Sequence, residues 1–140
     1  MYKKIALTLF ISLFLTGCLE ETPPENVMNS KIILRSGIDD VGGFTVKQVI
    51  ESIHYLEKHG DTNVKCRGWE KSHNRYTYIY TYESGGIRHT VVSDFYPQGD
   101  YTIFRNAQNP SFLAARQDLM GYASVYARIA MNADQESKLN

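Results

Sequence analysis

The sequence has little cysteine, no excess of either charge and no apolar run long enough to cross a membrane as a helix. Its 140 residues include two cysteines, Cys18 and Cys66, so a framework of several disulfides is excluded. The 15 basic and 15 acidic residues balance, which argues against a protein that binds nucleic acid. The apolar run from Ile5 to Leu15 has 11 residues, whereas a membrane-spanning helix needs about 20.

Motifs that mark common enzyme classes are absent as well. The sequence has no G-x-S-x-G, P-loop, Gly-rich dinucleotide fingerprint or C-x-x-C. His54, Glu57 and His59 do not match the zinc-protease pattern, because His54 and His59 would lie about 140° apart around a helix. Asp39 and Asp40 lie among glycines and are interpreted as turn residues. We therefore predict no metal, no cofactor and no enzyme. A hydrolase whose groups converge from distant positions stays open as an alternative.

The first 18 residues have the pattern of an export signal. Lys3 and Lys4 precede the apolar run, and small residues follow it. The last four residues, Leu15-Thr16-Gly17-Cys18, resemble the lipobox of bacterial lipoproteins. That resemblance implies cleavage before Cys18 and lipid on Cys18, which anchors the protein to a membrane. The alternative is an ordinary secretory signal that contains a cysteine by chance.

Cleavage at this position would leave a mature chain of 123 residues, enough for one domain. It would carry 13 basic and 15 acidic residues, a net charge of −2. Leu19 follows the cysteine, and in the lipoprotein class the lack of aspartate there implies an outer-membrane protein facing the periplasm. The inner membrane and the cell surface are alternatives. The predicted organisation is a signal peptide (1–17), a lipidated disordered tether (18–30), a single domain (31–132) and a frayed tail (133–140).

Two helices are predicted, one on each side of a run of strands. Thr45 and Gln48 form a capping box, and an apolar stripe at helical spacing predicts a helix over 45–59 that ends before Gly60. Asn109 and Pro110 are typical of an N-cap and a first helical residue, so a second, long helix is predicted over about 110–131.

The strands are predicted at 31–35, 64–71, 75–83 and 101–105, with another after the Gly85-Gly86 turn. A turn at those glycines pairs Glu83 with Arg88. The same register sets Tyr82 against His89, Tyr80 against Val91, Tyr78 against Ser93 and Tyr76 against Phe95. The element order predicts an α+β fold, with an antiparallel meander of three to four strands and both helices on its tyrosine face.

The central strand alternates between two kinds of side chain. Tyr76, Tyr78, Tyr80 and Tyr82 share one face, which we interpret as the core; an exposed platform for sugar rings or a peptide is the alternative. Cys66 alternates with two charged neighbours and is predicted to point inward. The opposite face is the predicted partner-binding surface, because exposed sheets and sheet edges accept partner proteins. Its candidate residues are Ile79, Thr81, Thr90 and Val92.

The stretch Gly43-Phe44-Thr45-Val46-Lys47-Gln48-Val49, with Trp69 and the Tyr76–Tyr82 strand after it, resembles small lipoproteins of the outer-membrane protein assembly machine. Those proteins are non-catalytic scaffolding subunits. This chain lacks the Leu-Gly-x-Pro turn of that family and adds a long final helix. We therefore expect an accessory lipoprotein that binds an envelope protein in an assembly, secretion or exclusion apparatus. A peptidoglycan or small-ligand binder is the alternative.

Overall fold

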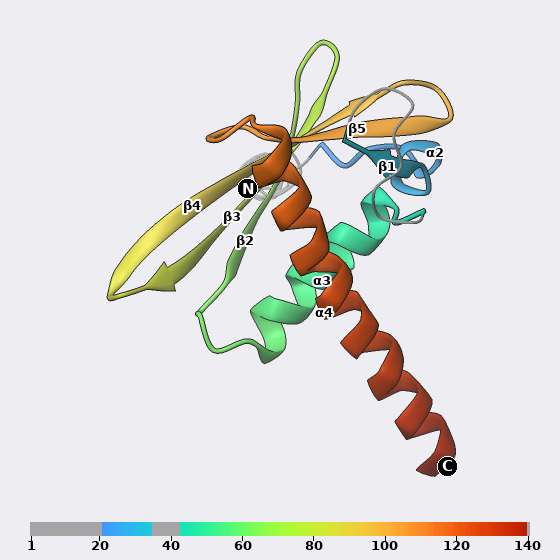
Figure 1. Ribbon diagram of the computed structural model, residues 1–140, viewed down its shortest axis with the longest axis vertical. Helices are drawn as coiled ribbons and strands as arrows, with labels where there is room; N and C mark the ends of the chain where they lie inside the picture. The colour runs from blue at the N-terminus through green and yellow to red at the C-terminus, as the bar shows by residue number, and fades with distance from the viewer. Residues whose placement is uncertain (1–20, 35–42, 140) are drawn as a thin grey trace, which may run out of the picture.

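The computed structural model describes residues 21–34 and 43–139. The predicted signal peptide, the lipobox with Cys18, and the Asp39-Asp40 turn lie outside these ranges. In chain order the elements are α2 (Glu25–Met28), β1 (Lys31–Ile33), α3 (Val46–His59), β2 (Lys65–Lys71), β3 (Tyr76–Ser84), β4 (Ile87–Pro97), β5 (Tyr101–Asn106) and α4 (Phe112–Leu139). The five strands form one sheet in the order β1-β5-β4-β3-β2, and α3 and α4 cross each other beside it (Figure 1). The α+β fold class is confirmed.

The sheet is mixed rather than purely antiparallel, which corrects the predicted meander. Strands β2 to β5 are antiparallel to their neighbours, but β1 pairs parallel with β5, with Ile33 opposite Ile103. The Ser30 and Thr102 hydroxyl oxygens, 2.6 Å apart, lie close to this junction. A strand of three residues is too short to show the alternation of apolar and polar residues that marks a strand. Its partner β5 lies some seventy residues later, so the order of the elements in the sequence could not reveal the pairing.

The β3–β4 hairpin has the predicted register. Glu83 pairs with Arg88 and Tyr80 with Val91, and the other three predicted pairs are present too. Gly85 and Gly86 have φ of +59° and +76°, and a type I′ hairpin turn requires positive φ at both of its central residues. The guanidinium of Arg88 donates to the Glu83 carboxylate over 2.7 Å beside the turn.

A β-bulge in β2 changes which side chains of that strand face the core. Cys66 pairs with Tyr80 and Gly68 pairs with Ile79, so the register shifts between them. Gly68 has φ of +113°, which glycine adopts without strain. Because of the extra residue, Cys66 and Trp69 both pack toward the helices, and Trp69 is buried in the core.

Helix α3 begins and ends as predicted. The Thr45 hydroxyl accepts the Gln48 N–H at 3.2 Å and the Gln48 side chain accepts the Thr45 N–H at 2.8 Å, which confirms the capping box. Both helices pack on the tyrosine face, as predicted: His54 of α3 hydrogen-bonds the Tyr78 hydroxyl, and Tyr122 of α4 hydrogen-bonds the Tyr80 hydroxyl.

Helix α4 differs from the prediction at both ends. It begins at Phe112, because the Ser111 hydroxyl rather than Asn109 accepts a first-turn N–H, that of Ala114 at 3.1 Å. It continues to Leu139 instead of stopping near 131, and residues 132–139 are helical. This last part is exposed and projects from the domain (Figure 1). Among the described residues, no helix combines the length and the hydropathy needed to cross a bilayer.

The folded domain also starts earlier than predicted. Residues 21–30 were expected to belong to a disordered tether, but they include α2 and contribute Val27 and Ser30 to the buried residues. The Glu21 N–H donates to the Trp69 carbonyl over 3.3 Å. The polar composition of this segment concealed the positions that pack, which are Pro23, Val27, Met28 and Ser30, so composition alone predicted disorder.

Candidate functional site

The four predicted partner-binding residues lie together on the sheet face opposite α3 and α4. Ile79 is the direct cross-strand neighbour of Val92, and Thr81 is the direct neighbour of Thr90. Side chains of directly opposed residues in antiparallel strands lie within about 5.5 Å of each other. The four residues therefore form one small block across β3 and β4, as the sequence register predicted.

The four residues are not equally available to a partner. Thr81 is 4% exposed and its hydroxyl accepts a 2.7 Å hydrogen bond from Arg88, so it holds the hairpin together. Thr90 is exposed, and Ile79 and Val92 are half-buried. The side chains left for contact are therefore Ile79, Thr90 and Val92.

Two further apolar residues, missed from the sequence, extend this face toward the opposite edge. Tyr96 of β4 follows Val92 by four residues and so shares its face, and it pairs with Ile103 of β5. Both side chains are half-buried. The alternation along β4 could have indicated Tyr96, whereas Ile103 required knowing how β5 pairs. We call the set Ile79, Thr90, Val92, Tyr96 and Ile103 the outer face.

A buried carboxylate lies at the middle of the outer face. Asp94 is 7% exposed and accepts a 2.7 Å hydrogen bond from the Thr77 hydroxyl, with Arg75 Nε at 3.7 Å. Its neighbours along β4 on the same face are Val92 and Tyr96. Like Thr81, Asp94 is buried and already bonded, so it holds the strands together, and the apolar side chains on either side of it are left for contact.

The tyrosine ladder is mainly core. Tyr78 is 1% exposed and Tyr80 is 8% exposed, while Tyr76 and Tyr82 are half-buried at the ends of the row. Burial raises the pKa of Tyr80 to about 12, so its hydroxyl stays protonated at neutral pH. A platform of four exposed tyrosines is therefore not formed, which corrects the alternative prediction for these residues.

A polar cleft of about 340 Å³ lies between the hairpin and the start of α4. The rings of Tyr82 and His89 stack there with centroids 5.1 Å apart. Asp118 faces the cleft and accepts a 2.7 Å hydrogen bond from the Asn106 amide, and its burial raises the pKa of the carboxyl group. An aromatic surface beside amide and carboxyl groups can hold a neutral polar ring such as a sugar.

His54, Glu57 and His59 each contact a different partner. His54 bonds the Tyr78 hydroxyl at 2.8 Å, and His59 packs on Tyr55 with ring centroids 4.5 Å apart. The carboxylate of Glu57 accepts the backbone N–H of Cys66. Within residues 21–34 and 43–139, no group of three or more His, Cys, Asp or Glu side chains is placed to hold a metal ion.

Comparison with known proteins adds no relative. The chain matches no protein-family model, no curated protein and no solved structure. The resemblance to assembly lipoproteins stays a prediction from the sequence, and the proposals below rest on the residues of this chain.

Proposed function

We propose that this protein is a non-catalytic lipoprotein of the bacterial cell envelope that binds another envelope protein as an accessory subunit. Lipid on Cys18 anchors it, on the periplasmic side of the outer membrane. The outer face of its sheet receives the partner. The lipobox-like sequence Leu15-Thr16-Gly17-Cys18 supports the anchor, and the lack of any recognised catalytic motif in the sequence supports an accessory role.

The outer face is the observation that carries the proposal. Antiparallel sheets with helices on one face commonly present mostly polar side chains on the other. Here both faces carry apolar residues, because Ile79, Val92, Tyr96 and Ile103 point away from the helices. Half-buried apolar side chains suit a partner surface, since their further burial drives association.

The partner surface is tested by copurification. The full-length protein carries a tag at its C-terminal end, where α4 is exposed, and is isolated in detergent from cells that produce it natively. The double variant Ile79→Thr/Val92→Thr keeps β-branched residues in both strands and removes apolar contact area. The matched control is Leu113→Thr/Met120→Thr, which changes two exposed apolar residues of α4.

The wild type and the control are expected to bring down one envelope protein in stoichiometric amount. The outer-face variant should recover at least about tenfold less, which corresponds to a loss of about 1.4 kcal/mol. Equal recovery by all three proteins would remove the outer face from consideration. A monomer at native expression, with no partner for any variant, would contradict the accessory role.

Lipid attachment is tested separately by the mass of the mature protein. Cleavage before Cys18 with acylation gives a chain that begins at that residue and gains the mass of its acyl groups. The Cys18→Ala variant should be neither lipidated nor cleaved there. An unmodified mature chain with a free Cys18 thiol would show that the export signal is an ordinary one.

The polar cleft beside Tyr82 and His89 favours a second candidate function, the binding of a peptidoglycan fragment or another small polar ligand. The support is the stacked ring pair next to Asn106 and Asp118. Soluble peptidoglycan fragments titrated into the protein should shift the NMR signals of this cleft, and His89→Ala should abolish the shift. Unchanged spectra at millimolar fragment would dismiss this candidate.

A further inference from the structure

The first residue of the described domain is fixed to one edge of the sheet. Glu21 donates its backbone N–H to the carbonyl of Trp69 over 3.3 Å. Trp69 belongs to β2, which is the last strand in the order β1-β5-β4-β3-β2 and therefore an edge. The chain thus leaves the folded domain beside β2 in the direction of Cys18.

Very little chain separates this contact from the proposed anchor. Cys18 precedes Glu21 by three residues, so their Cα atoms are at most about 11 Å apart, whatever the conformation between them. If Cys18 carries lipid, as proposed above, it sits at the membrane surface. The edge formed by β2 must then lie within that short reach of the headgroups.

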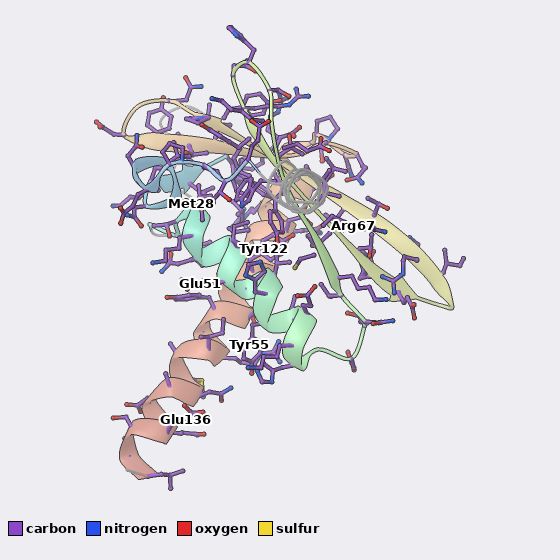
Figure 2. All side chains as sticks on the ribbon, turned by 180° about the vertical axis from the view of Figure 1, so that it is seen from behind. Met28, Glu51, Tyr55, Arg67, Tyr122 and Glu136 are labelled. Carbon is purple, nitrogen blue, oxygen red and sulfur yellow. The ribbon has the colours of Figure 1, made fainter. Side chains whose placement is uncertain are left out.

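The side chains along this edge are suited to binding phosphate groups. Lys65, Arg67 and Lys71 are exposed in β2, and none of the ion pairs formed among the described residues includes them. Figure 2 marks Arg67 on the strands, apart from the labelled residues of α3 and α4. Within residues 65–75 the acidic residue is Glu70. From outside this range, the Glu57 carboxylate accepts the Cys66 N–H, and the backbone of Glu21 is bonded to Trp69.

The turn after β2 continues the same surface. Residues 72–74 are exposed, and Arg75 lies 3.7 Å from Asp94, so its charge is partly balanced. In Figure 1 this turn is at the upper end of the long axis, and the end of α4 is at the lower end. A domain attached near the turn therefore directs the end of α4 away from the attachment point.

We propose that the β2 edge and the following turn, residues 65–75, form the surface that faces the membrane and that Lys65, Arg67 and Lys71 contact phospholipid headgroup phosphates. The lipid on Cys18 keeps this edge of the domain near the membrane, and the basic side chains select one orientation of the domain. They do so because negatively charged headgroups attract cations that lie within a Debye length of the membrane surface. The positive charges also block strand addition at this edge, so a partner protein is left the outer face. The inference rests on the proposed lipidation of Cys18.

The test measures which end of the full-length, lipidated protein touches the bilayer. A fluorescent amino acid replaces Asn74 in the turn or Ser137 near the end of α4, both of which are exposed. Each protein is placed in vesicles of phosphatidylethanolamine and phosphatidylglycerol that contain a lipid with a nitroxide on its headgroup. Flotation of the vesicles reports attachment, and quenching by the nitroxide reports contact.

Quenching at position 74 is expected to be severalfold stronger than at position 137. The variant Lys65→Gln/Arg67→Gln/Lys71→Gln should lose most of this difference while still floating with the vesicles. The control variant Lys47→Gln/Lys58→Gln/Arg128→Gln, which changes exposed basic residues of α3 and α4, should retain it.

Three other outcomes would contradict, in turn, the orientation, the headgroup contacts or the lipid anchor. Equal quenching at both positions, or stronger quenching at 137, in a protein that floats would overturn the orientation and leave lipidation intact. A triple β2 variant that behaves like its control would overturn the headgroup contacts. A protein that carries no lipid and does not float would overturn both this inference and the proposed anchor.

Discussion

Replacing Tyr122 by phenylalanine is expected to destabilise the protein, although the change removes a single oxygen atom. The Tyr80 and Tyr122 hydroxyl oxygens are 2.6 Å apart, and the two residues are 8% and 5% exposed. This hydrogen bond joins strand β3 to α4. Without its partner, the Tyr80 hydroxyl stays buried and loses a hydrogen bond, which costs about 1–3 kcal/mol.

The double variant Tyr80→Phe/Tyr122→Phe should recover most of that loss, because it leaves neither hydroxyl unsatisfied. The two single variants and the double variant form a double-mutant cycle with an expected coupling of about 2 kcal/mol or more, since each single variant leaves one hydroxyl unsatisfied and the double variant leaves none. Tyr55→Phe is the matched control: the Tyr55 hydroxyl bonds Asn132 at an exposed position, so its removal should cost less than about 0.5 kcal/mol.

Urea unfolding of all five proteins measures these free energies, and the slope of the free energy against urea should not change. A double variant whose loss of stability equals the sum of the two single losses would contradict this prediction. It would mean that the two hydroxyls do not satisfy each other. Single variants as stable as the wild type would show that these tyrosines are not packed between the sheet and α4.

Three further predictions concern stability. Thr45→Ala removes a confirmed cap and should lower the free energy of unfolding by about 1 kcal/mol, whereas Thr90→Ala at an exposed position should not, as urea titration can check. Gly121→Ala adds a methyl group that meets no atom within 4 Å in an exposed part of α4, so it should stabilise the protein by about 0.5–1 kcal/mol; a fall in melting temperature would contradict this. Burial raises the pKa of Tyr80 from 10.0 to about 12, so the stability from its protonated form is complete below pH 10 and is lost between pH 10 and 12, and the loss should be smaller for Tyr80→Phe in alkaline melting experiments.

Local patterns predicted the parts of this fold that local chemistry determines. The capping box located the start of α3, and the glycine pair fixed the hairpin register, because each requires residues a few positions apart. The hairpin register in turn placed Ile79 beside Val92 on the outer face. Those two contact residues could therefore be predicted from the sequence alone.

The features that were missed depend on contacts between distant residues. The pairing of β1 with β5 joins segments some seventy residues apart in the sequence, and the bulge at Gly68 depends on how β2 fits against β3. Val27 packs in the core, and Glu21 donates its N–H to the carbonyl of Trp69, so both depend on residues far along the chain. Ile103 belongs to the outer face only because β5 lies beside β4, so no pattern within its own strand could have assigned it.

Site-specific photocrosslinking in living cells tests directly whether the outer face binds a partner protein. A photoreactive amino acid replaces Val92 on the outer face in one strain and Met120 on the exposed side of α4 in another, in the otherwise unchanged full-length protein. We expect position 92 to crosslink to one envelope protein in the membrane fraction and position 120 not to do so. No adduct at position 92, or the same adducts at both positions, would contradict a partner-binding outer face.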